Sequence, residues 1–169
     1  LQLTGRSSRQ IARVGLARTF QNTELFGDLS VLENVMVGYD QRLSYGIFDA
    51  VLRMPRMWRE ERECRKTAIG LLDFVGLLPQ ANNAAKFLPF GLQRRLEIAR
   101  ALAAKPRLLL LDEPAAGLTT QEIDDLEAMI RKIANLGISV LLIEHHVELI
   151  MALADTVTVL DYGQVIASD

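Results

Sequence analysis

The sequence predicts an α/β fold, in which a mostly parallel sheet is flanked by helices and a helical subdomain is inserted ahead of its second half. From about residue 105 onward, short apolar runs alternate with helical patterns. Residues 31–104 show helical patterns without a clear strand. Half of the side chains are apolar and 24% are charged, as in an ordinary globular chain. Strands that alternate with helices favour a parallel sheet that is covered on both faces.

The elements of the second half follow from its apolar pattern. Arg107–Leu111 is a strand candidate whose last four residues are all leucine, and it ends at a pair of carboxylates. Gln121–Ala134 carries its apolar residues on one helical face and is closed by Gly137. The remaining elements are a second buried strand, a helix and a closing hairpin: Ser139–Ile143, His145–Leu153, and the strands Thr156–Leu160 and Gln164–Ala167.

Composition and charge exclude several classes of protein. Residues 1–66 carry 11 basic and 8 acidic side chains, and the whole chain has a net charge of −2. Arginines at every third position from Arg53 to Arg65 alternate with glutamates, which is typical of a solvated helix face. A nucleic-acid-binding domain would be net positive, so no nucleic-acid partner is expected. The apolar runs are too short to span a bilayer, and the single cysteine, Cys64, favours the cytoplasm.

The most informative local feature is the apolar strand that ends in Asp112 and Glu113. Ligands of parallel sheets bind at the carboxyl ends of the strands. Adjacent strand residues point to opposite faces, so one carboxylate can organise Mg²⁺ while the other orients an attacking water. The alternative is a structural aspartate at a capped strand end.

A histidine and a glycine extend this pattern. His145 follows the next apolar strand, where a histidine is either structural or catalytic. Gly91 lies at the start of a predicted helix, where a glycine permits close backbone approach and free N–H groups attract phosphate. An amphipathic helix preceded by a glycine turn is the alternative interpretation of Gly91.

Together these motifs resemble the nucleotide-binding subunit of an ATP-binding cassette (ABC) transporter, which has the P-loop NTPase fold. The resemblance covers nearly the whole chain, and the motifs occur in the family's order. It implies that Asp112 is the Walker B aspartate that binds ATP–Mg²⁺, that Glu113 is the catalytic base and that His145 is the switch histidine. It also implies that Gln21, in the Q-loop Arg18-Thr19-Phe20-Gln21, contacts Mg²⁺ and the attacking water.

Two further motifs of the family concern the nucleotide and the partner cassette. Leu88–Gln93 resembles the signature motif, so Gly91 and Gln93 are expected to bind ATP. Ala116–Thr119 occupies the position of the D-loop.

Within the family, the sequence most resembles the ATPases of branched-chain amino-acid importers. The segments that carry this likeness are the Q-loop with Leu25-Phe26, and Leu29–Val35, Leu96–Leu102, Asp112–Leu118 and Ile143–His145. A urea or amide importer and a lipopolysaccharide-export ATPase remain alternatives. A cassette ATPase acting on DNA or ribosomes is disfavoured by the acidic second half.

The sequence departs from the family pattern at four positions in these motifs. Pro89 replaces the usual serine of the signature and offers neither a hydroxyl nor an N–H, and Leu92 replaces a usual glutamine. Thr119 stands where many members have Asp or Asn, and His146 stands where Asp is common. Reduced contacts to ATP across a dimer are expected from the signature changes.

The chain also contains no P-loop, G-x-x-x-x-G-K-[ST], whose backbone N–H groups and lysine would cradle phosphates. The family places this loop upstream of Gln21, so we expect an N-terminally truncated portion of a cassette that is inactive in isolation. A non-hydrolysing interaction module, which docks on a permease or a partner cassette, is the competing hypothesis.

The resemblance also implies a domain division and partners. Residues 1–30 would be a partial catalytic core with the Q-loop, residues 31–104 the helical subdomain, and residues 105–169 the rest of the core. The expected partners are integral-membrane permease subunits and a second ABC ATPase subunit, on the cytoplasmic face of the plasma or inner membrane. A permease helix would enter a groove beside the Q-loop, with Leu32, Val35 and Val37 either lining it or filling the subdomain's own core.

Overall fold

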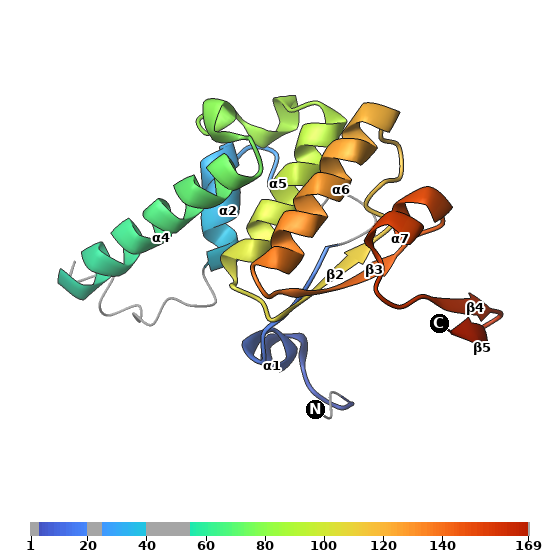
Figure 1. Ribbon diagram of the computed structural model, residues 1–169. Coiled ribbons are helices and arrows are strands. Elements are labelled where there is room, and N and C mark those ends of the chain that lie inside the picture. Colours follow the sequence, from blue (N-terminus) through green and yellow to red (C-terminus); the bar gives the residue numbers. More distant parts are fainter. Residues whose placement is uncertain (1–3, 20–24, 40–54, 169) are drawn as a thin grey trace.

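The computed structural model describes residues 4–19, 25–39 and 55–168 (Figure 1). Short 3-10 turns, η2 and η3, precede the central helix α5. In chain order the elements are α1 (Ser8–Arg13), β1 (Leu16–Arg18), α2 (Val31–Tyr39), α4 (Pro55–Phe74), η2 (Leu78–Gln80), η3 (Ala85–Phe87), α5 (Phe90–Ala103), β2 (Leu108–Asp112), α6 (Thr120–Asn135), β3 (Ser139–Ile143), α7 (Val147–Leu153), β4 (Thr158–Asp161) and β5 (Gln164–Ser168).

A three-stranded parallel sheet, in the order β1-β2-β3, lies at the centre of the fold. The predicted strand at 107–111 is confirmed as β2, one residue later, and the predicted strand at 139–143 is confirmed as β3. Strand β1 was not predicted, because three residues that end in an arginine show no apolar run. It pairs with β2 through the register Leu16 to Leu108.

The predicted helix at 121–134 is confirmed as α6, and its apolar face is the buried one. Gly137 follows it with φ +80°, the left-handed conformation that ends many helices, and its N–H donates to the carbonyl of Ala134. Helix α7 begins at Val147, so the prediction of a helix from His145 is wrong by two residues, and both histidines precede it. The predicted hairpin is confirmed as the antiparallel pair β4–β5.

Helices α2, α4 and α5 pack together and carry much of the core (Figure 1). Leu32 and Val35, two of the three residues considered for a groove, are buried in this core, whereas Val37 is exposed. The buried side chain of Asn34 bonds to the N–H and carbonyl of Phe26, so it ties the segment before α2 to the helix.

The two faces of the sheet differ in their cover. Leu109 and Leu111 are completely buried, on the face that packs with α5 and α6. Leu141 and Ile143 of β3 point to the other face and are half exposed. The predicted parallel sheet with flanking helices is confirmed, and within the described residues α1 contacts the sheet at β1. Among these same residues, no helix combines the length and the apolar character that crossing a membrane requires.

Candidate active site at the carboxyl edge of the sheet

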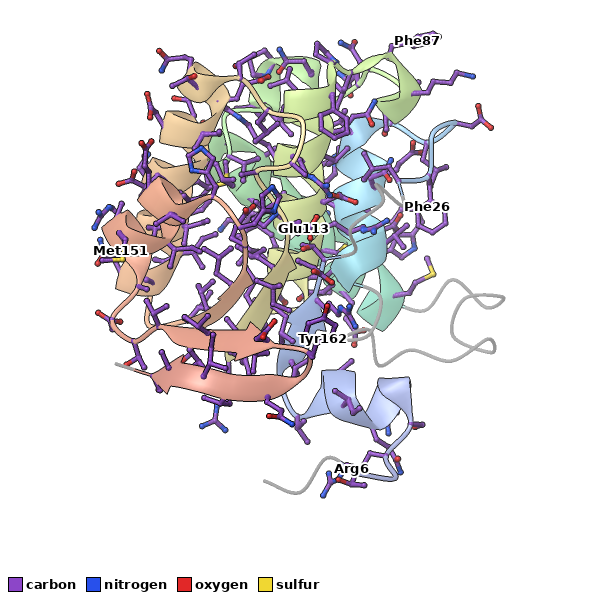
Figure 2. All side chains as sticks on the ribbon, turned by 90° about the vertical axis from the view of Figure 1, so that its right-hand side faces the viewer. Arg6, Phe26, Phe87, Glu113, Met151 and Tyr162 are labelled. Atoms are coloured by element: carbon purple, nitrogen blue, oxygen red, sulfur yellow. The ribbon has the colours of Figure 1, made fainter. Side chains whose placement is uncertain are left out.

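Three of the predicted site residues lie where β2 and β3 end. Asp112 is the last residue of β2 and lies opposite Ile143, the last residue of β3. Glu113 follows with φ +44°, and its N–H still donates to the carbonyl of Ile143, at 2.9 Å. His145 lies two residues beyond Ile143. The parallel register thus brings Asp112, Glu113 and His145 to one edge of the sheet, with Glu113 near the centre of the face in Figure 2.

The backbone at Glu113 alters one sequence expectation. Alternation along a strand was expected to send the two carboxylates to opposite faces. Glu113 lies outside β2 in the left-handed region, which non-glycine residues occupy rarely and mostly at special sites. Its direction is therefore set by the turn that follows, in which its carbonyl accepts a hydrogen bond from Ala116.

Asp112 forms an ion pair with Arg18, the last residue of β1, with 2.8 Å between Nη2 and Oδ2. The Asp112 side chain remains partly exposed. Arg18 was part of the Q-loop motif but was not among the predicted site residues. Arg18 could have been predicted from its position, because it ends the strand that lies beside β2. That prediction requires recognising β1, which shows no apolar run.

Glu144 is a second site residue that sequence reasoning missed. Its side chain is 0% exposed, and its carboxylate accepts hydrogen bonds from the backbone N–H groups of Ala115, His145 and His146. The neighbouring His145 side chain is 75% exposed, with its Nδ1 at 3.8 Å from Oε2 of Glu144. No periodic pattern in the sequence distinguishes a buried carboxylate that binds backbone groups.

The signature segment forms the start of α5. Pro89 occupies the N-cap position without a capping side chain, and Nε2 of Gln93 donates to the carbonyl of Leu88. Gly91 is required by a close approach, since a Cβ there would lie 2.0 Å from Oε1 of Glu122 on α6. The structure therefore places Gly91 and Gln93 at the start of α5, against α6, and not among the residues at the ends of β2 and β3.

The D-loop segment connects these two regions. Gly117 has φ +77°, and a Cβ on it would lie 3.1 Å from the ring of Phe90 at the start of α5. Thr119, one of the departures, is the N-cap of α6 and forms a capping box with Glu122. Its hydroxyl thus has a clear structural role.

The donors at the sheet edge fit one magnesium ion that is bound mainly by phosphates. Mg²⁺ in nucleotide sites takes one or two carboxylates and keeps its other positions for water and phosphate. Asp112 supplies one partly exposed carboxylate at this edge. No cluster of three or more histidine, cysteine or acidic residues that could hold a metal occurs in the described part of the chain. Gln21, the other predicted magnesium ligand, lies outside the described residues.

Comparison with known protein families gives a match to the ABC transporter family over residues 2–116. Curated relatives include the high-affinity branched-chain amino acid transport ATP-binding proteins LivG of Escherichia coli and BraF of Pseudomonas aeruginosa. Each is 41% identical to this chain over 167 residues. The alignment covers 98% of this chain, which spans 66% of the length of each relative.

Solved structures give the same fold. A nucleotide-free ATP-binding cassette from an ABC transporter matches with a TM-score of 0.80 and 26% identity, over 98% of this chain and 65% of that one. A dimeric post-hydrolysis state of an ATP-binding cassette, bound to ADP and phosphate, matches in fold with a TM-score of 0.80 at 23% identity. That match covers all of this chain and 69% of the other.

Proposed function

The chain belongs to the ABC transporter family, and from this premise we propose that the complete gene product hydrolyses ATP to drive the import of branched-chain or related amino acids. The observation that carries the proposal is the convergence of Asp112, Glu113 and His145 at the carboxyl edge of the parallel sheet. The 41% identity to LivG and BraF supports the class of solute.

We propose for the site residues the roles that the resemblance to the family implies. Asp112 would hold Mg²⁺, which supplies charge stabilisation for the transferred phosphoryl group when it is bound. Glu113 would accept a proton from the attacking water as a general base. His145, with its largely exposed ring, would contact the terminal phosphate. Gln21 would contact Mg²⁺ and the water.

Gly91 and Gln93 would serve the nucleotide from the start of α5. Free N–H groups at a helix start attract phosphate, and Gly91 lies in the first turn of α5. Because this segment is separate from the edge that bears Asp112, we propose that it acts on ATP bound by a second ABC ATPase subunit. Pro89 offers no hydroxyl for this contact.

The proposed membrane partner is a permease subunit, with this protein peripheral on the cytoplasmic face of the plasma or inner membrane. Phe26 and Phe87 are exposed, at 49% and 76%, on two segments that lie side by side (Figure 2). These segments are joined by the hydrogen bond from the N–H of Lys86 to the carbonyl of Gly27. Exposed aromatic side chains are favoured anchors of protein interfaces. We propose that residues 31–104 form the helical subdomain of the docking lobe, between a partial core at 1–30 and the remaining core at 105–169.

Uptake in living cells tests the proposal. Deletion of the gene should lower the uptake of leucine, isoleucine and valine, and the wild-type gene should restore it. Asp112→Asn should fail to restore uptake, because an amide carries no charge to hold Mg²⁺. Asp155→Asn, a change of an exposed surface residue, is the matched control and should restore uptake. Normal uptake of these amino acids after deletion, with loss of another solute such as urea, would contradict the proposed solute.

A further inference from the structure

The chain segments that leave β2 and β3 stay bonded to each other beyond the last strand pair. The N–H of Glu113 donates to the carbonyl of Ile143, which extends the ladder by one bond. Past that point the next bond is made by a side chain, because Oε1 of Glu144 accepts from the N–H of Ala115 at 2.8 Å. The carboxylate therefore replaces a backbone carbonyl where the two segments diverge.

The second oxygen of the same carboxylate holds the other segment. Oε2 accepts from the N–H of His145 at 2.9 Å and from the N–H of His146 at 3.2 Å. These bonds fix the turn that precedes α7. The Glu144 side chain itself is 0% exposed, so its carboxylate depends on these three backbone N–H groups for hydrogen bonds.

We propose that Glu144 is a positioning residue that sets the placement of His145 relative to Glu113 by clamping the turn at 113–116 to the turn at 144–146. The proposal rests on the proposed function, since it assigns Glu144 a role in the same hydrolysis site. Glu144 acts through the backbone of its neighbours and does not itself touch the substrate. The clamp uses both acceptor oxygens of the carboxylate, Oε1 for Ala115 and Oε2 for His145 and His146.

Substitution by glutamine separates the two halves of the clamp. Glu144→Gln keeps the length of the side chain but has a single acceptor oxygen, so either Ala115 or the His145 and His146 pair must lose its partner. Glu148→Gln is the matched control, because Glu148 is an exposed residue in the first turn of α7. Glu144→Asp, with both oxygens on a chain one methylene shorter, gives a second variant if the glutamine form folds poorly.

Two readouts test the proposal in the complete gene product. Hydrogen exchange resolved to single amides should be faster by about tenfold or more in Glu144→Gln, at Ala115 or at His145 and His146. In Glu148→Gln the exchange of these three amides should match that of the wild type. Steady-state ATP hydrolysis by Glu144→Gln should show a kcat lowered roughly 10–100-fold, the effect of misplacing a site group, with KM changed less than about threefold. A general loss of stability would raise exchange throughout the chain and would lower kcat only through the loss of folded protein.

The outcomes distinguish the clamp from the proposed function. Faster exchange at the named amides together with a lower kcat supports the proposal. Unchanged exchange, or faster exchange with a wild-type kcat in both Glu144 variants, overturns it. A wild-type protein that hydrolyses no ATP would contradict the proposed function, and with it any role of Glu144 in turnover. In that case the exchange data still report separately whether Glu144 clamps the two turns.

Discussion

His146 leaves one buried polar atom unsatisfied at the edge of the site. Its Nδ1 has no hydrogen-bond partner among the described residues, and the residue occupies the N-cap position of α7 without capping the helix. Buried polar atoms without partners are costly, and uncapped helix starts leave backbone N–H groups unsatisfied. Histidine in place of the family's common aspartate therefore lowers the stability of the fold, through the unsatisfied nitrogen and the uncapped start of α7.

We predict that His146→Asn stabilises the protein relative to His146→Ala by about 1 kcal/mol, the usual value of an N-cap. The side-chain oxygen of asparagine can accept a hydrogen bond from the free N–H groups at the start of α7. Alanine removes the unsatisfied Nδ1 of His146 but supplies no acceptor. Asparagine is preferred to aspartate in this test because the Glu144 carboxylate already accepts from the N–H of His146. Urea unfolding of the two variants measures the difference. An asparagine variant no more stable than the alanine variant would show that position 146 does not cap α7.

At the scale of the element, α6 depends on a capping box that is sensitive to pH. The pKa of Glu122 is held below its ordinary value of about 4.5, first by the hydrogen bond from the backbone N–H of Thr119 and then by that from its hydroxyl. A depressed carboxyl pKa stabilises the folded state above the ordinary pKa. That stabilisation is lost as the pH falls through the lower, folded-state value.

The corresponding prediction compares Glu122→Gln with the wild type across the acid range. Near neutral pH the wild type should be the more stable protein, because an ionised acceptor binds the N–H more strongly than an amide does. The difference should shrink as the pH falls below about 4.5 and vanish once Glu122 is protonated. Thermal unfolding at a series of pH values measures it, with Asp155→Asn as the control for loss of a surface charge. A difference that is constant with pH would contradict this account of the cap.

The elements that could be predicted are those whose own sequence contains the signal. Strands β2 and β3 are continuous apolar runs, and α6 combines one apolar face with a terminal glycine, so their bounds agree within one or two residues. Strand β1 is too short to show a pattern and exists because β2 pairs with it. The positions of Asp112, Glu113 and His145 follow from strand ends, whereas the roles of Arg18 and Glu144 depend on contacts between distant segments. Such contacts leave no local trace in the sequence.

At the scale of the whole molecule, the site and the proposed docking surface are built from different elements of the fold. The residues of the site come from the ends of β2 and β3, while Phe26 and Phe87 precede α2 and α5 (Figure 2). Helices α2 and α5 are the most extensively packed pair of elements in the described chain. A partner bound at the two phenylalanines would therefore lie next to the start of α5, the helix that precedes β2 in the chain.

This arrangement predicts that Phe26→Ala and Phe87→Ala each weaken association with the permease by about tenfold or more, as the loss of an aromatic anchor does. Tyr162→Ala is the matched control, since Tyr162 is a fully exposed aromatic residue at the turn of the β4–β5 hairpin. Binding of the purified variants to permease in lipid nanodiscs measures the effect. Wild-type affinity in both phenylalanine variants, or equal weakening by Tyr162→Ala, would place the docking surface elsewhere.

The central claim, that the carboxyl edge of this sheet hydrolyses ATP with Glu113 as the base, is tested most directly by the turnover rate of Glu113→Gln in the complete gene product. Glutamine keeps the shape of the side chain and removes its basic oxygen, so turnover should fall by roughly 10²–10⁴-fold. The affinity for ATP–Mg²⁺ should stay close to that of the wild type, because the proposed magnesium ligand Asp112 is unchanged. Near-normal turnover by Glu113→Gln would contradict the account.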